Sequence, residues 1–191
     1  MRAALIWSAV AVILMLPLAQ AAVSPLMAWR QPVYIAASLA GVLALGVMVL
    51  QPLWIAQVLP VRRIGLWHRW GGIALLALVL AHVAGLWLTS PPDVVDALLL
   101  RAPTWFSVWG VLALWAVVLA AGVAVLRRRL HPRRFRAVHI GAVSLAVGAT
   151  VAHAALIDGT MASSGKIVLG LGVLFGLAAA LWRRKAWRLL R

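Results

Sequence analysis

Long apolar stretches alternate with short polar connections along this chain. Six segments approach or exceed the 20 or so residues that a helix needs to cross a hydrocarbon core about 30 Å thick. They cover about 3–22, 33–58, 66–89, 104–126, 137–157 and 166–182. Proline, glycine and charge mark the connections between them, and Pro52 is expected to kink the second segment or to start an interfacial turn. The pattern predicts an all-α membrane protein, a six-helix bundle forming one domain over residues 1–191.

Composition supports this fold class. The chain has 191 residues, 65% of them hydrophobic, with no cysteine and only three acidic residues. The absence of cysteine excludes disulfides, iron–sulfur clusters and thiol catalysis. A net charge of +15 could suggest nucleic acid, but the arginines occur in short blocks between apolar runs and no recognition module accompanies them. We therefore expect membrane lipid, and not nucleic acid, as a partner.

The charges predict an orientation through the positive-inside rule. One side holds most of the cations: Arg2, Arg62, Arg63, Arg69, the block from Arg127 to Arg136, and a basic tail over 183–191 suited to anionic headgroups. The other side holds Arg30, Arg101, Lys166 and all three acids, Asp93, Asp96 and Asp158. Both termini are expected in the cytoplasm of a bacterium, with the chain passing repeatedly through the inner membrane. Tryptophans near the predicted boundaries are typical of an aromatic belt: Trp67, Trp70, Trp87, Trp105, Trp182 and Trp187.

The first segment has two interpretations. Met1-Arg2, the apolar run and the small residues up to Ala22 also resemble a secretory signal with its cleavage site. Cleavage would leave five spans without changing the orientation of the rest. We favour a retained helix.

Four histidines stand out because they form two pairs with one spacing. His68 and His82 are fourteen positions apart, and so are His139 and His153. Fourteen helical residues end about 40° short of four turns, so each pair lies on nearly one face, about 21 Å apart along the axis. Ionisable side chains inside spans are costly and usually functional. We expect two facing couples, His68 with His139 near the cytoplasm and His82 with His153 near the outer face.

The residue types favour haem as the ligand of these couples. Zinc and copper sites usually recruit carboxylates or thiols, and no span contains Asp, Glu or Cys. Haem needs only axial ligands, because the porphyrin supplies four nitrogens. Small residues could give the ring clearance or could simply pack helices: Gly71, Gly85, Ala142, Ala146 and Ala149. Haem propionates could pair with nearby cations, although these could equally serve topology alone: Arg62, Arg63, Arg69 and Arg136, with Arg101 or Lys166 on the outer side.

The remaining histidine and the glycine-rich stretches indicate no site. His131 precedes a proline among arginines, which predicts a solvated turn residue. Gly170-Leu171-Gly172 follows no strand, and Ser164-Gly165-Lys166 lacks the other residues of a phosphate-binding loop.

The histidine-bearing segments resemble a known family. The run from Arg62 to Trp70, followed by His82, resembles the third helix of the ferric reductase-like transmembrane domain. The run from Arg127 to His139, followed by His153, resembles the fifth. The resemblance implies two b-type haems, with iron axial ligands His68 and His139 at the cytoplasmic haem and His82 and His153 at the outer one. Many members continue into a flavin and NAD(P)H domain, so a separate flavoprotein or a quinol is the expected donor here.

These features predict an electron-transfer cytochrome b, an oxidoreductase component that passes electrons to an acceptor at the outer, periplasmic face. One alternative is the quinol-fed haem subunit of a periplasmic methionine sulfoxide reductase, although in that subunit an aromatic residue tends to replace the histidine at position 68. A histidine-based metal or proton transporter is an alternative from another class, which the lack of intramembrane carboxylates disfavours. A purely structural subunit would leave the matched spacing unexplained.

Overall fold

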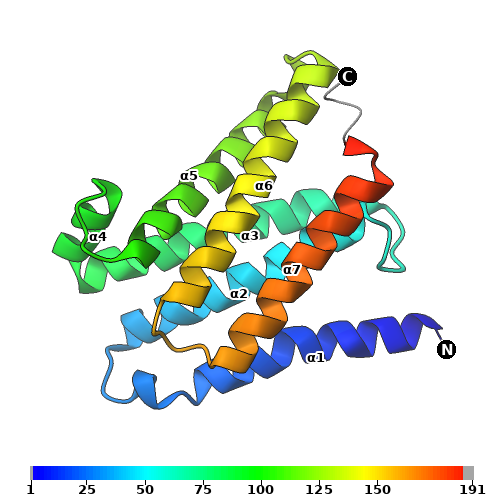
Figure 1. Ribbon diagram of the computed structural model, residues 1–191. Coiled ribbons are helices and arrows are strands. Elements are labelled where there is room, and N and C mark those ends of the chain that lie inside the picture. Colours follow the sequence, from blue (N-terminus) through cyan, green and yellow to red (C-terminus); the bar gives the residue numbers. More distant parts are fainter. Residues whose placement is uncertain (1, 187–191) are drawn as a thin grey trace.

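The predicted all-α membrane fold is confirmed. The computed structural model describes residues 2–186, which contain helices and turns but no strand (Figure 1). Six of its helices are long and apolar enough to cross a membrane. They are α1 (Arg2–Ala22), α2 (Pro32–Ile55), α3 (Ile64–Thr89), α5 (Trp105–Val125), α6 (Pro132–Leu156) and α7 (Ser163–Arg183). Residues 187–191 of the expected basic tail, including Trp187, lie outside the described part of the chain.

Proline residues account for the main differences from the expected boundaries. A short helix, α4 (Pro91–Leu98), lies in the connection between the third and fourth predicted segments, and α6 begins at Pro132 instead of about 137. Proline fits the first turn of a helix because its missing N–H would be unpaired there anyway. The Ser90 hydroxyl also donates to the Asp93 carboxylate at the start of α4. Two single-turn 3₁₀ helices, η1 (Pro25–Met27) and η2 (Leu126–Arg128), complete the connections.

Pro52 contributes to packing, and α2 continues for about one turn beyond it. The helix ends at Ile55, where the Ala56 amide donates to the Pro52 carbonyl at 2.8 Å. A Cβ placed on Gly176 of α7 would lie 2.9 Å from Pro52 Cγ. The proline ring therefore occupies space that a glycine leaves open on α7.

Two antiparallel hairpins, α2–α3 and α5–α6, form the most extensive helix contacts. Helix α7 packs on α2, α1 and α6, and α1 also contacts α2 (Figure 1). The largest fully buried aliphatic side chains include Val147 of α6 with Leu169 and Val173 of α7. The second hairpin is thus joined to the first largely through α7.

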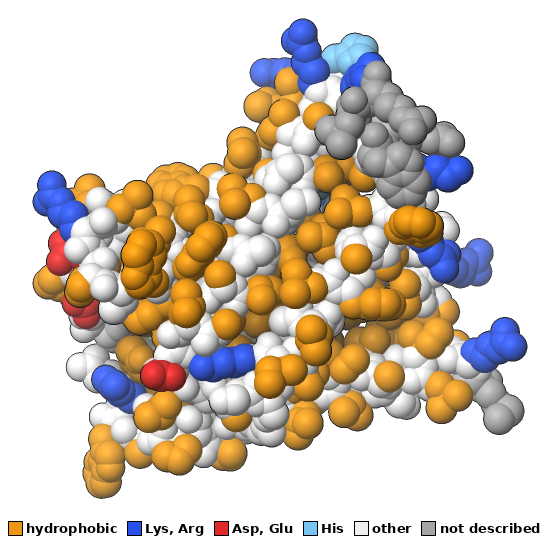
Figure 2. All heavy atoms as spheres, viewed as in Figure 1, with side chains coloured by type: hydrophobic (Ala, Val, Ile, Leu, Met, Phe, Trp, Pro, Cys, Tyr) orange, Lys and Arg blue, Asp and Glu red, His pale blue; other side chains and the backbone are white. Residues whose placement is uncertain are grey.

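Charge is divided between the two ends of the bundle. The basic end comprises the start of α1, the end of α7 and the α2–α3 and α5–α6 connections, and it contains no acidic residue. The acids lie at the opposite end, in α4 and after α6, so they are far from most of the blue side chains in Figure 2. Tryptophans near the helix ends are exposed, as expected for an aromatic belt: Trp67, Trp70, Trp87, Trp105 and Trp182.

Gly71 and Gly85 let α3 approach α2 closely. A Cβ on Gly85 would lie 2.6 Å from the Cβ of Ala37, and one on Gly71 would lie 2.6 Å from Trp54 Cζ3. Both glycines therefore face α2. The sequence suggested that these glycines could make room for a ring between α3 and α6. They face α2 instead, so they serve helix packing, which was the alternative interpretation. On α6, Ala142, Ala146 and Ala149 are buried.

Replacing Gly85 by alanine should destabilise the α2–α3 hairpin. The added methyl group meets Ala37, and overpacking of this kind costs about 1–3 kcal/mol. Thermal unfolding of the purified protein in detergent measures the effect. Gly72→Ala, on the same helix, is the matched control because nothing lies within 4 Å of its Cβ position. Alanine there should be neutral or stabilising by up to about 1 kcal/mol. Equal melting temperatures for the two variants would contradict the close approach at Gly85.

Candidate functional site

The fold brings together His68 and His139, one of the two couples expected from the sequence. His68 on α3 and His139 on α6 have ring centroids 6.3 Å apart, with planes at 82°. His82 and His153 lie further along the same two helices and are within electrostatic range of each other. All four side chains are half-buried. The two couples therefore occupy two levels of the bundle.

Each histidine is supported by the partner helix of its own hairpin. Helix α3 packs against α2, and α6 packs against α5, whereas α3 and α6 are not among the closely packed pairs in the described part of the chain. The His68 and His139 rings approach each other between the two hairpins. A ligand bound by one histidine from α3 and one from α6 would therefore connect the two hairpins.

Hydrogen bonds from Nδ1 fix three of the four imidazoles. His82 Nδ1 lies 2.8 Å from the Ala37 carbonyl, His153 Nδ1 lies 2.8 Å from the Phe106 carbonyl, and His139 Nδ1 lies 3.2 Å from the Ala120 carbonyl. A carbonyl can only accept, so Nδ1 must carry the proton. In a neutral imidazole the lone pair is then on Nε2. This is the tautomer of a histidine that binds a metal through Nε2.

Glycines lie beside the two carbonyls that the imidazoles approach most closely. A helical carbonyl points along the axis toward the N–H of residue i+4, so a side chain there flanks it. That residue is Gly41 after Ala37 and Gly110 after Phe106, and a Cβ on either glycine would lie 2.9 Å from the histidine Nδ1. After Ala120 it is Ala124, where the bond lengthens to 3.2 Å.

His68 is the exception in this series. Its ring lies beside the backbone of Gln51, but Nδ1 is buried without a hydrogen bond of normal geometry. The residue four positions after Gln51 is Ile55, the bulkiest of the four. Two further buried nitrogens lack a partner among the described residues, Gln51 Nε2 and Trp54 Nε1, and they lie on the same stretch of α2.

These contacts show that the two hairpins are built on one plan. Ala37 and Gln51 are fourteen residues apart on α2, and Phe106 and Ala120 are fourteen apart on α5, matching the spacing of the histidines that face them. Both hairpins also run in the same sense. The sequence shows only the histidine half of this repeat, because backbone carbonyls carry no residue signature.

Two phenylalanines that sequence reasoning missed pack against the histidines. Phe135, one turn before His139, stacks on its ring with centroids 5.4 Å apart and planes at 20°. Phe106, whose carbonyl accepts from His153, also places its ring edge-on to that imidazole at 6.1 Å. The i to i+4 spacing of Phe135 and His139 was a usable signal, since such pairs share a helix face.

Most of the cations considered for propionate binding are exposed, and Lys166 is half-buried. Arg62, Arg63, Arg69 and Arg136 are exposed at the basic end, and Arg63 has left-handed backbone where α3 begins. Lys166 Nζ donates to the Ile157 carbonyl at 2.6 Å, while Arg101 is exposed after α4. His131 is exposed, as expected, and its Nδ1 accepts from the Arg133 amide, so it caps α6.

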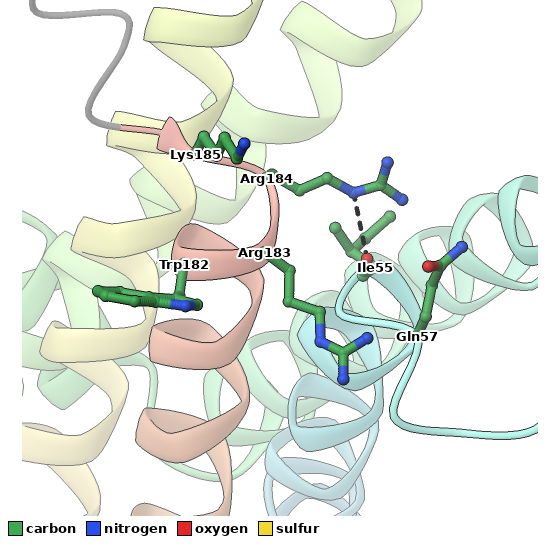
Figure 3. Close-up of a pocket in the computed structure, with 6 residues that line it drawn as sticks. All are labelled: Ile55, Gln57, Trp182, Arg183, Arg184 and Lys185. Atoms are coloured by element: carbon green, nitrogen blue, oxygen red, sulfur yellow. Dashed lines mark hydrogen bonds between the residues drawn. The ribbon is translucent and has the colours of Figure 1, made fainter.

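Two surface cavities lie at opposite ends of the bundle. One of about 520 Å³ lies at the basic end between the ends of α2 and α7, lined by Ile55, Gln57, Trp182, Arg183, Arg184 and Lys185 (Figure 3). The other, of about 500 Å³, lies beside Gln20, Asp158 and Lys166. Neither is lined by a histidine, so both are separate from the couples.

The His68–His139 couple fits a metal that brings its own equatorial ligands. Two imidazoles bound on opposite sides of one ion through bonds of about 2.0 Å have ring centres about 6 Å apart, close to the separation of His68 and His139. No group of three or more His, Cys, Asp or Glu side chains suited to a bare metal ion occurs within residues 2–186. Haem needs only two axial donors.

Comparison of the chain with protein-family models, with curated proteins and with solved structures finds no match. The functional argument therefore depends on the histidine geometry.

Valine at Gly41 or Gly110 should displace the facing imidazole. Either side chain would occupy the space of His82 Nδ1 or His153 Nδ1, and the carbonyl bond would be lost. Should the His82–His153 couple hold a haem, each variant would lose that haem while the His68–His139 couple would keep its own. Haem extraction and quantification against protein checks this. Gly148→Val on α6 is the control, since nothing lies within 4 Å of its Cβ position. Full haem content in both variants would contradict the expectation.

Proposed function

We propose that this chain is a transmembrane electron-transfer cytochrome b of ferric reductase-like type. His68 and His139 would ligate one haem and His82 and His153 a second, through Nε2 in each case. The observation that carries the proposal is the set of three Nδ1–carbonyl bonds, which leaves the Nε2 lone pairs of His82, His139 and His153 for a metal.

Bound haems would supply one-electron redox centres at the two levels of the bundle. The chain's own contribution is to hold each imidazole in one tautomer and at a fixed depth. Both axial positions of each centre would be occupied by protein nitrogen, which favours outer-sphere electron transfer over substrate binding at the metal. The protein would set the redox potentials of the two haems through their burial and through the Nδ1 hydrogen bonds of their ligands.

The charge distribution supports a direction for the transfer. The basic end, which would face the bacterial cytoplasm under the positive-inside rule, is next to His68 and His139. Electrons from a flavoprotein or a quinol would enter there. They would leave near His82 and His153, at the end that carries the acids and the cavity beside Lys166, for a periplasmic acceptor.

Haem stoichiometry is the first test. A dithionite-reduced minus oxidised spectrum of the purified full chain should show b-type bands, with about two haems per chain. His82→Ala or His153→Ala should remove one haem and leave the other, and so should His68→Ala or His139→Ala.

His131→Ala is the matched control, because His131 is exposed and caps α6. One haem in the unmodified chain would favour a subunit of the periplasmic methionine sulfoxide reductase type. A colourless protein after haem-supplemented expression would refute the proposal and favour a histidine-based transporter.

The angle between the His68 and His139 rings predicts a spectroscopic signature. Axial imidazoles with planes near 82° give a low-spin ferric signal of high anisotropy in electron paramagnetic resonance, whereas parallel planes give a less anisotropic one. Stacking by Phe135 helps to hold the His139 plane. Phe135→Ala should therefore change this signal alone, and Phe135→Tyr should preserve it. The same spectrum for Phe135→Ala and the unmodified protein would show that stacking does not set the plane.

A further inference from the structure

The cavity at the basic end lies where α2 and α7 finish side by side. The end of α2 contributes Ile55 and Gln57 to its lining, and the end of α7 contributes Trp182 and the run from Arg183 to Lys185. In Figure 3 the side chains of Arg183 and Arg184 extend from α7 toward Ile55 and Gln57. Three consecutive cations therefore border one space of about 520 Å³.

No acidic side chain balances these cations. The three acids of the chain, in α4 and after α6, lie at the opposite end of the bundle. Carbonyls at the ends of the two helices attract positive charge, which accounts for part of the cluster. Arg184 Nε donates to the Ile55 carbonyl at 3.2 Å. A guanidinium has five N–H donors, so this bond orients Arg184 and leaves its terminal nitrogens for another acceptor.

The depth of the cavity indicates where that acceptor comes from. Helices α2 and α7 are both long and apolar enough to span a membrane, and the cavity lies at the end that they share. Trp182 is 74% exposed at this level, as in an aromatic belt. About two and three turns deeper along α7, Phe175 and Leu171 are also exposed. The surface thus changes from apolar to cationic in the order in which a phospholipid changes from acyl chain to phosphate.

We propose that this cavity binds the phosphate group of one anionic phospholipid between Arg183 and Arg184, with the acyl chains along α7. Guanidinium groups bind phosphate oxygens in a bidentate manner, and basic pockets between spans on the cytoplasmic side take anionic head groups. The bound lipid stabilises the contact between α2 and α7. The site is separate from the histidine couples and does not depend on what they hold.

Native mass spectrometry of the purified full chain, titrated with phosphatidylglycerol, tests the proposal. One phosphatidylglycerol per chain should bind before any other, and phosphatidylcholine with the same acyl chains should bind more weakly because its head group has no net charge. The double variant Arg183→Gln with Arg184→Gln should weaken the first binding step by about tenfold or more, since each cation near an anionic lipid contributes about fivefold.

Two variants separate a defined site from general attraction to a basic surface. Arg128→Gln with Arg129→Gln removes the same charge from the same end, but neither residue lines the cavity. This control should bind the first lipid like the unmodified chain. Arg184→Lys keeps the charge but loses the fork of the guanidinium and the Nε donor to Ile55, so it should also weaken binding.

Thermal unfolding gives a second measurement and shows whether each variant is folded. A ligand that binds only the folded chain raises its melting temperature. Phosphatidylglycerol should therefore raise the melting temperature of the unmodified chain and of the Arg128/Arg129 control more than that of the Arg183/Arg184 variant.

Equal weakening in the two double variants, or full binding in Arg184→Lys, would overturn the defined site in favour of general surface charge. Phosphatidylcholine binding as tightly as phosphatidylglycerol would overturn the selection for an anionic lipid. Displacement of phosphatidylglycerol by millimolar inorganic phosphate would identify a site for free phosphate and overturn the lipid proposal. Haem content is measured separately, so the cytochrome proposal can fail or succeed independently of these results.

Discussion

The candidate site depends on one interaction, a hydrogen bond from a histidine Nδ1 to a backbone carbonyl of the neighbouring helix. A buried imidazole needs a partner for its N–H in a medium without water. Helical carbonyls already accept from the amide four residues on, but each keeps a second lone pair. Using it requires two helices in close contact and little side chain beside the carbonyl. Gly41 and Gly110 meet that requirement, and the bonds there are the shortest.

This requirement explains the organisation of the bundle. Each hairpin combines one helix that carries histidines with one that supplies carbonyls, and the pairs Ala37–Gln51 and Phe106–Ala120 have the same spacing as the histidines that face them. Gly85 keeps α3 close to Ala37, whose carbonyl receives His82. Helix α7 then joins the hairpins through Leu169 and Val173, which are fully buried. Two levels of paired imidazoles follow from one repeated contact.

The repeat is not perfect, and its departure is confined to one place. His68 Nδ1 lies against the backbone of Gln51 on α2, but without the normal hydrogen-bond geometry that the other three histidines have.

Sequence alone determined the membrane class, the six spans and the four histidines, because hydropathy and a fourteen-residue spacing are properties of local sequence. It misplaced the start of α6 and missed α4, since a proline can begin a helix as well as end one. Only the tertiary structure decided the role of the glycines. Gly71 and Gly85 face α2, while Gly41 and Gly110 make room for imidazoles. The carbonyl partners of His82 and His153 lie 45 and 47 residues earlier in the chain, on helices whose rotation and contact are set by packing. No local pattern encodes that contact.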